Sequence, residues 1–285
     1  MLNAKAARND EFYTQLSDIE KELQYYEKHF YDKTVYLNCD NPSFSNFWKY
    51  FNLNFNHLGI KKLIATYYDN NNKVYRFELT KANDDGTPIE LKTIGLKQNG
   101  DFRSSESIEI LQKADIIVTN PPFSLFREYI KQLTDYGKTF LIVGNKNAVI
   151  YKEMFPLMMN NQVWLGVTRL TEFILPSGEL STNMNGLTRW FTNLEHDKRN
   201  EELILYKTYN NTDYPTFDNS DIINVDKVKD IPSDYNNVIG VPITFFDKWN
   251  PNQFEIVGIT QGEQSVNGKT RYARILIKKI GGGDE

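Results

Sequence analysis

The chain has 285 residues, and its 40% hydrophobic and 14% aromatic content is typical of a folded globular protein. Its formal net charge of −4 argues against binding by non-specific attraction to phosphates, so a nucleic-acid contact would need a local basic cleft. The single Cys39 excludes an intramolecular disulfide and predicts a cytoplasmic setting, and no apolar run is long enough for a transmembrane helix.

Helical and strand patterns alternate at the start of the chain. Residues 11–30 place apolar side chains at helical spacing, and residues 43–59 do so again, with Ser43 as a candidate N-cap. Short apolar runs at 34–39 and 61–68 predict strands. An initial helix is thus followed by a strand, a second helix and a second strand.

The next stretch predicts a hairpin followed by a short helix. Residues 73–96 alternate apolar and polar side chains on both sides of the turn at 84–86. We expect a strand that ends near Gly100, and a capped helix over residues 104–114.

The middle of the chain indicates the fold class. Buried strands at 114–120 and 138–145 are separated by a helix at 124–136, and a helix interrupted by Pro156 follows. Apolar strands separated by helices predict a parallel sheet covered on both faces. After residue 160 strand-like pieces prevail, at 162–167, 187–194, 202–209, 240–246, 254–260 and 271–280. We therefore predict an α/β domain with a β-rich C-terminal region.

The motif Asn120-Pro121-Pro122-Phe123 follows a buried strand and precedes a helix. Ligands of open α/β sheets bind at the carboxyl ends of strands. The amide oxygen of Asn120 and the carbonyl of Pro121 are two acceptors, and the prolines fix the backbone that separates them. This arrangement suits a planar NH₂ group, and Phe123 could stack on the ring that bears it.

Hydrogen bonds from both amino protons direct the nitrogen lone pair at an electrophile such as an activated methyl group. This chemistry needs no metal and no covalent enzyme intermediate, and the three histidines lie far apart in sequence. The alternative is a proline turn that ends a strand, with Phe123 in the core. A motif of this kind arises by chance in roughly one chain in a hundred of this length.

The motif resembles that of amino-methyltransferases that use S-adenosyl-L-methionine, and other stretches resemble the EcoRI-type adenine-specific DNA methyltransferases. These stretches span nearly the whole chain in the order of that family, at 10–15, 22–26, 38–51, 61–66, 100–108, 164–167, 240–245 and 274–278. The resemblance implies a Rossmann-like methyltransferase sheet with helices on both faces. It also implies that residues 120–123 hold an extruded adenine.

The resemblance assigns cofactor contacts as well. Those positions are Asp10, Phe12, Tyr13 and Thr14 for the methionine end, Asp40, Asn41 and Pro42 in the turn after the first strand, Asp69 for the ribose, and Asp101 and Phe102 for the adenine ring. The turn after Cys39 departs from the general methyltransferase pattern because it contains no glycine. Asp69 also fits a solvated turn aspartate, and Asp101 also fits a helix cap.

A methyltransferase of this kind must take the adenine out of the duplex, because a stacked and paired amino group cannot reach a methyl donor. The polar stretch 168–190 is a candidate DNA-reading loop. Candidate DNA contacts are Arg103, Lys146, Asn147, Arg169, Arg189, Lys269 and Arg271. Each also fits an ordinary solvated charge or loop residue.

We therefore expect a site-specific adenine-N6 methyltransferase, with a core at 1–195 that binds S-adenosyl-L-methionine and a target-recognition region at 196–285. Along the chain, the expected cofactor-binding segments come first, the catalytic motif second and the target-recognition region last. This order is the gamma arrangement of amino-methyltransferases. Double-stranded DNA is the expected partner, and a cognate restriction endonuclease would not need a stable complex with it. Methylation of RNA adenine or of a protein glutamine remains open, as does an inactive DNA-binding relative.

Overall fold

The computed structural model describes residues 13–81, 90–171, 173–174, 180–181, 186–218, 220–260 and 264–281. The chain divides into two compact units, each described by itself. Unit 1 comprises Met1–Lys146 and Gly166–His196, and unit 2 comprises Asn147–Leu165 and Asp197–Glu285. Within the described ranges, no helix is long and apolar enough to cross a membrane.

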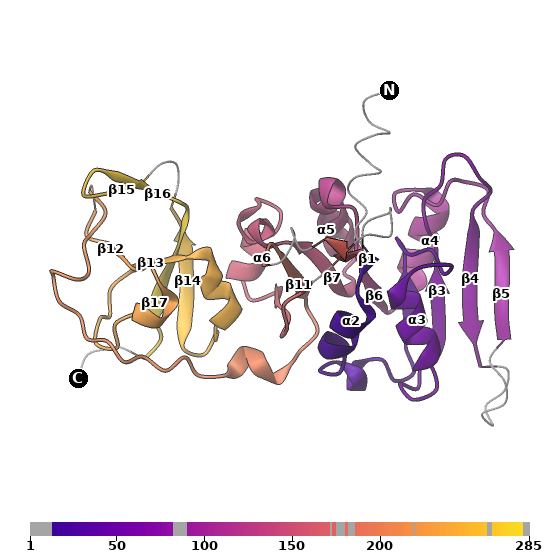
Figure 1. Cartoon of the computed structure of the whole chain (residues 1–285), viewed down its shortest axis with the longest axis horizontal. Helices are drawn as coiled ribbons and strands as arrows, with labels where there is room; N and C mark the ends of the chain where they lie inside the picture. The colour runs from indigo at the N-terminus through magenta and orange to yellow at the C-terminus, as the bar shows by residue number, and fades with distance from the viewer. Residues whose placement is uncertain are drawn as a thin grey trace. The chain divides into compact units, whose positions relative to one another are not determined.

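Unit 1 is built on a large mixed sheet with the strand order β5-β4-β3-β2-β6-β7-β11. The parallel strands are β2 (Thr34–Leu37), β3 (Lys62–Ala65), β6 (Ile116–Thr119) and β7 (Thr139–Asn145). The antiparallel strands are β4 (Tyr75–Thr80), β5 (Glu90–Gly95) and β11 (Thr188–Thr192). The expected parallel sheet is present, and the two strands of the expected hairpin pair with each other, whereas its turn at 84–86 lies outside the described residues. Figure 1 shows β3, β4 and β5 side by side.

Helices cover both faces of this sheet. The helices are α2 (Leu16–Leu23), α3 (Asn46–Leu53), α4 (Ser105–Lys113) and α5 (Phe126–Asp135). Trp190 of β11 meets Phe47 of α3 edge-on at 5.9 Å, whereas its neighbour Phe191 meets Phe126 of α5 at 5.4 Å between ring centroids. Since successive side chains of a strand point to opposite faces, α3 and α5 lie on opposite sides of the sheet. This confirms the Rossmann-like class.

The main core of unit 1 lies between the sheet and the pair α2 and α3. Val35 and Leu37 of β2 belong to this cluster with Phe51 of α3 and Ile19 of α2. These side chains are 0% exposed. Burial of such side chains contributes about 1.5–3 kcal/mol each.

Some local expectations were wrong. The helix expected over residues 11–30 is confined to α2 and the short 3₁₀ helix η1 (Glu27–His29). The N-cap of α3 is Ser45, not Ser43, because the Ser45 hydroxyl accepts from the backbone N–H of Trp48. The strand expected at 202–209 is absent from the described residues, where Lys207 forms only an isolated bridge with Pro232.

The strand expected to end near Gly100 is also absent, because β5 ends at Gly95 and turns follow. Gly100 has a φ of +73°, and a Cβ there would lie 2.0 Å from the carbonyl oxygen of Tyr67. Only glycine fits this close approach in a left-handed conformation. At this edge of the sheet β4 pairs with β3 in antiparallel register.

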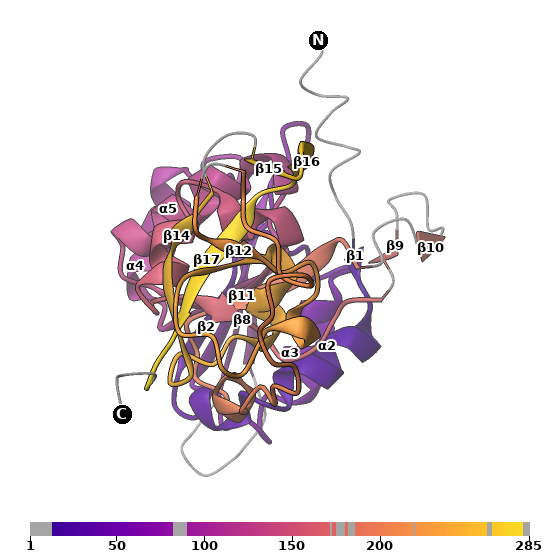
Figure 2. The ribbon, with the colours of Figure 1, turned by 90° about the vertical axis from the view of Figure 1, so that its left-hand side faces the viewer.

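A small separate sheet has the order β1-β9-β10. Its strands are β1 (Tyr13–Thr14), β9 (Phe173–Ile174) and β10 (Leu180–Ser181), and Figure 2 shows them lying together. Thr14 pairs with Phe173 in antiparallel register. The stretch expected to read DNA therefore contacts the segment expected to hold the cofactor.

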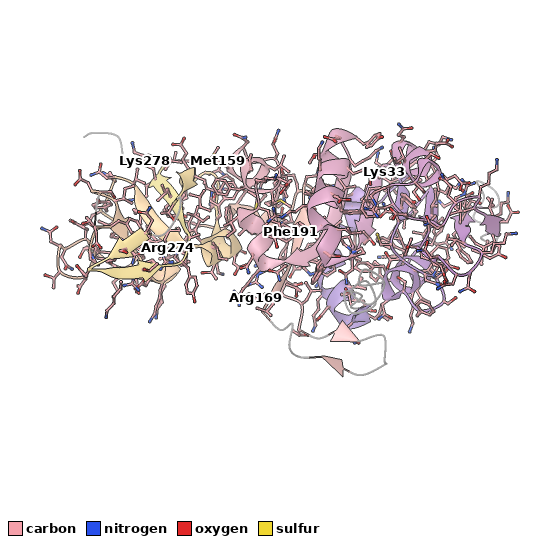
Figure 3. The ribbon with its side chains drawn as sticks, turned by 90° about the horizontal axis from the view of Figure 1, so that it is seen from above. Lys33, Met159, Arg169, Phe191, Arg274 and Lys278 are labelled. Carbon is pink, nitrogen blue, oxygen red and sulfur yellow. The ribbon has the colours of Figure 1, made fainter. Side chains whose placement is uncertain are left out.

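Unit 2 is the β-rich part. Its four-stranded sheet has the order β12 (Ile223–Asn224), β13 (Ile239–Pro242), β17 (Arg274–Lys279) and β14 (Phe254–Ile259). A hairpin consists of β15 (Gln264–Val266) and β16 (Lys269–Arg271). The unit also contains α6 (Phe155–Met159) and β8 (Trp164–Leu165). The remaining 3₁₀ helices of the chain are η2 (Phe123–Leu125), η3 (Lys146–Ile150), η4 (Asp197–Asn200), η5 (Val228–Asp230) and η6 (Ile243–Lys248). Arg274, labelled in Figure 3, starts β17 and bonds to Asn224 and Asp226.

Candidate active site

The candidate site lies in unit 1 at the carboxyl ends of the parallel strands. Asp40 follows β2, Asp69 follows β3, and Asn120 follows β6 directly. These strands are neighbours in the sheet, so their ends meet at one edge. This edge is where open α/β sheets bind ligands.

The candidate catalytic motif, residues 120–123, contacts the N-terminal segment. The side-chain amide of Asn120 donates a long hydrogen bond of 3.4 Å to the hydroxyl of Thr14. The carbonyl oxygen of Thr14 in turn accepts from the side-chain amide of Asn46 at 2.9 Å. The segment around Thr14 and the motif at 120–123, which only the family resemblance connects at the sequence level, thus lie side by side.

The double proline presents its two carbonyl groups differently. The carbonyl oxygen of Pro122 accepts from the backbone N–H of Leu125 at 3.0 Å and starts η2. Among the described residues, none donates a hydrogen bond to the carbonyl oxygen of Pro121. Phe123 is partly buried and packs against the main core. Within the described part of the chain, the Pro121 carbonyl therefore remains an acceptor without a donor.

Asp40 lies inside the protein. Its carboxylate accepts from the hydroxyl of Ser45 at 2.7 Å and from the hydroxyl of Thr119 at 2.6 Å. Burial raises the pKa of Asp40 to about 6, and the two hydroxyl donors only partly offset this. Asn41 and Pro42 are half-buried, and the carbonyl oxygen of Asn41 accepts from the backbone N–H of Ser45 at 2.8 Å.

Asp69 forms the turn after β3. Its carboxylate accepts from the backbone N–H groups of Asn71 and Asn72, at 2.8 and 3.1 Å, and from the side-chain amide of Asn72 at 2.9 Å. The hydrogen bond from the Asn72 side chain is the largest cause that lowers the pKa of Asp69. These contacts agree with its alternative role as a turn aspartate and leave its ribose contact a prediction.

Asp101 is paired with Arg103. The Asp101 carboxylate accepts from the Nε atom of Arg103 at 2.9 Å and from a terminal nitrogen at 2.7 Å. Burial raises the pKa of Asp101, but the hydrogen bonds from Arg103 outweigh it and hold that pKa below the usual value. Arg103 also bonds to Glu128 and lies over the ring of Phe102, which is buried edge-on against Tyr129. A carboxylate accepts about four hydrogen bonds, so Asp101 retains capacity for a ligand.

The candidate DNA contacts in unit 1 differ in exposure. Arg169, labelled in Figure 3, is exposed. Lys146 is half-buried, and its backbone N–H donates to the carbonyl oxygen of Leu187 at 2.7 Å. Arg189 is only 5% exposed and donates to the carbonyl oxygens of Gly186 and Thr188. These contacts favour a structural role for Arg189.

The candidates in unit 2 are Asn147, Lys269 and Arg271. Asn147 and Lys269 are exposed. Arg271 forms an ion pair of 3.6 Å with Asp226. Asp10, Phe12 and the side chain of Tyr13 lie outside the described residues.

Sequence reasoning missed two buried acids of α2. Glu22 is 0% exposed and accepts from the backbone N–H groups of Val167 and Thr168 at 2.8 and 2.6 Å. Asp18 is 1% exposed and accepts from the backbone N–H of Thr171 at 2.8 Å. Both acids share the helix face of Ile19, and an acid within an apolar stripe is a signal for a buried partner.

The fold is of the Rossmann-like methyltransferase type, and the candidate motif Asn120-Pro121-Pro122-Phe123 begins directly after β6. The family model described as "Adenine-specific methyltransferase EcoRI" matches residues 1–281, and the chain belongs to this family of adenine-specific methyltransferases. In the described residues, no group of three or more His, Cys, Asp or Glu side chains could hold a metal ion.

Relatives match over nearly the full length of both chains. The chain is 47% identical to the Type II methyltransferase M.EcoRI of Escherichia coli, over 96% of this chain and 94% of the relative. It is 38% identical to the Type II methyltransferase M.MgeORF184P of Mycoplasma genitalium and 35% identical to M.MpnI of Mycoplasma pneumoniae, over 97% of both chains in each case. No solved structure matches significantly.

Proposed function

We propose that the protein transfers a methyl group from S-adenosyl-L-methionine to N6 of an adenine in duplex DNA, at a specific site. The observation that carries this proposal is the position of Asn120 and Pro121 at the end of β6, beside Thr14. The printed names of the relatives describe Type II methyltransferases and support the same reaction.

Asn120 and Pro121 bind the amino group of the extruded adenine. The amide oxygen of Asn120 accepts one amino proton and the carbonyl oxygen of Pro121 accepts the other. These bonds hold the nitrogen in place and direct its lone pair at the methyl donor. Phe123 stacks on the base. Catalysis then depends on orientation and on fixed dipoles.

The residues present fit S-adenosyl-L-methionine, which supplies an electrophilic methyl group when bound. Asn38 at the end of β2 is 2% exposed, and its side-chain nitrogen has no hydrogen-bond acceptor among the described residues. Such a donor suits an anionic or carbonyl group of a ligand. Asp69 and Asp101 would accept from its hydroxyl and amino groups. Thr14, Asn41, Pro42 and Phe102 would complete the binding surface, together with Asp10, Phe12 and Tyr13.

The duplex would contact residues around the site and in unit 2. Arg103, Lys146 and Arg169 are candidate contacts in unit 1, and Asn147, Lys269 and Arg271 in unit 2. We propose residues 1–195 as the catalytic core and residues 196–285 as the target-recognition region, with help from 168–190. A cytoplasmic location and a cognate restriction endonuclease are parts of this proposal.

The test measures radiolabelled methyl transfer to unmethylated duplex DNA, RNA and protein in parallel. We expect incorporation into DNA, and sequencing that detects N6-methyladenine would then give the recognition site. Incorporation into RNA or protein alone would reject the DNA substrate. In the Asn120→Ala variant, transfer should be lost while thermal unfolding is unchanged, and Asn54→Ala, at the end of α3, serves as the control.

A further inference from the structure

Asp40 joins two segments of unit 1. The hydroxyl of Thr119, the last residue of β6, donates to one carboxylate oxygen at 2.6 Å. The hydroxyl of Ser45, the N-cap of α3, donates to the other at 2.7 Å. The Ser45 oxygen also accepts from the backbone N–H of Trp48 at 3.1 Å. One carboxylate therefore sets the position of β6 against the start of α3.

These contacts close into a ring. Thr119 is followed by Asn120, whose amide donates to the hydroxyl of Thr14. Ser45 is followed by Asn46, whose amide donates to the carbonyl oxygen of Thr14 at 2.9 Å. Asn120 is thus fixed from two directions, by its neighbour in sequence and by the N-terminal segment.

The ring is closed to water at its centre. Asp40 is 7% exposed, Ser45 5% and Thr119 0%. A buried carboxylate is costly, and an apolar residue of similar volume commonly replaces a buried charge without loss of stability. The two hydroxyls offset this cost only in part, because the pKa of Asp40 remains raised. Stability alone is therefore a poor reason for a carboxylate at this position.

We propose that Asp40 is a positioning residue that fixes the amide of Asn120 through Thr119. In this role Asp40 acts on the orientation of the amino acceptor and does not itself hold the cofactor. The inference rests on the proposed function, since Asn120 is the group that it positions.

The geometry explains why a misplaced Asn120 would affect the rate. The amide oxygen of Asn120 and the carbonyl oxygen of Pro121 must meet the two protons of one NH₂ group. A shift of about 1 Å in one of two such groups costs up to roughly 100-fold in rate. Release of Thr119 from Asp40 frees the end of β6 to move by such an amount.

The first test compares Thr119→Val and Asp40→Asn with Tyr36→Phe. Tyr36 is a matched control because its hydroxyl forms another buried hydrogen bond of the same sheet, with Thr66 at 2.7 Å. We expect kcat to fall roughly 10- to 100-fold in Thr119→Val and in Asp40→Asn, with the dissociation constant of S-adenosyl-L-methionine unchanged in calorimetry. Thr119→Ser, which restores the hydroxyl, should recover most of kcat.

Two results would overturn the role of Asp40. One is a kcat in Thr119→Val equal to that of Tyr36→Phe. The other is a loss of cofactor affinity in Asp40→Asn with kcat retained, because this pattern belongs to a direct cofactor ligand.

A second readout does not depend on activity. In protein labelled with ¹⁵N-asparagine, the side-chain amide signal of Asn120 is assigned by its absence in Asn120→Ala. We expect Thr119→Val and Asp40→Asn to shift or broaden this signal and Tyr36→Phe to leave it in place. An unchanged signal in both variants would refute the inference even if the wild type proved inactive on DNA. If the proposed function fails but the inference holds, the wild type will not methylate DNA, whereas Thr119→Val and Asp40→Asn will still shift or broaden the amide signal of Asn120.

Discussion

Glu22 and Thr168 meet although they lie 146 residues apart in sequence. One carboxylate oxygen of Glu22 accepts from both the backbone N–H and the hydroxyl of Thr168, each at 2.6 Å. One turn earlier in α2, the carboxylate of Asp18 likewise accepts from the backbone N–H of Thr171, at 2.8 Å, and from its hydroxyl, at 3.1 Å. These two acids hold the backbone of residues 167–171, which leads into β9 and contains Arg169.

Removal of the Glu22 carboxylate should destabilise unit 1. Glu22→Ala leaves the backbone N–H groups of Val167 and Thr168 without their acceptor, and the hydroxyl of Tyr26 loses its bond of 2.8 Å. We expect a loss of about 3 kcal/mol or more in the free energy of unfolding, measured in urea. Glu20→Ala, exposed on the same helix, should change stability by less than about 0.5 kcal/mol. Equal effects would contradict the buried role of Glu22.

Gly166 is required for the close approach of Glu22. A Cβ at residue 166 would lie 2.2 Å from Oε1 of Glu22 and 2.6 Å from the Cβ of Trp190. Gly166→Ala should therefore cost about 1–3 kcal/mol in thermal or urea unfolding. Gly258→Ala is the control, because a Cβ there meets only Leu276, at 3.8 Å.

The stability contributed by Asp40 should depend on pH. Its folded-state pKa is about 6, above the usual value of 3.8, so the folded protein binds this proton more tightly than the unfolded chain does. Stability then falls as the pH rises through the interval from about 4 to about 6, by about 2–3 kcal/mol from this group. As the pH rises over this interval, the free energy of unfolding of Asp40→Asn should therefore increase relative to that of the wild type. Above pH 7 the difference between the two proteins should stay constant.

Asp69 is a control, because its contribution to the free energy of unfolding should change with pH in the opposite direction. Its hydrogen bonds lower its pKa, so its contribution is present above the unfolded-state pKa and is lost as the pH falls. Asp69→Asn should weaken the protein at neutral pH and not in acid. A flat difference between wild type and Asp40→Asn from pH 4 to 7 would contradict the raised pKa.

Arg169 and Arg189 should respond differently to alanine substitution. Arg169 is exposed, so Arg169→Ala should weaken DNA binding and reduce the slope of log affinity against log salt by about 1, with stability unchanged. Arg189 is buried and bonds to two backbone carbonyls, so Arg189→Ala should lower the unfolding temperature. Fluorescence anisotropy at several salt concentrations separates the two effects. A normal salt slope in Arg169→Ala would remove Arg169 from the DNA surface.

Periodicity predicted several regular elements well, because the spacing of apolar residues follows from which face of a helix or strand is buried. The strands β2, β3, β6 and β7 and the helices α4 and α5 all lie where apolar spacing places them. The position of Asn120 at a strand end followed from the same reasoning. The partners of Asp40 did not, because Thr119 lies 79 residues away and a carboxylate gives no sign of which distant hydroxyl it will meet.

The misplaced elements have local causes. Ser43 and Ser45 are equally good caps by residue type, and the carbonyl of Asn41, which accepts from the backbone N–H of Ser45, decides between them. Near Gly100, where a strand was expected, the backbone N–H groups of Lys97 and Gln98 donate to the carboxylate of Glu106, and Gly100 has a left-handed φ. The strand expected at 202–209 has strand-like spacing but pairs only at Lys207. Sequence spacing cannot report whether a neighbour is present.

The order in which the ribosome delivers the chain matters for when the enzyme becomes complete. The parallel strands that the structure describes in unit 1 are all encoded before residue 146, and Asn120 is among those residues. The strand that pairs with β1, and the backbone that Asp18 and Glu22 hold, come only with residues 167–174. During synthesis, an emerging chain can therefore carry the parallel strands of the unit 1 sheet and its candidate catalytic motif while two buried acids of α2 still lack their partners. Thr14 gains its pairing with Phe173 only at that stage, and β11 follows at Thr188–Thr192, so unit 1 becomes complete only after its C-terminal segment is made.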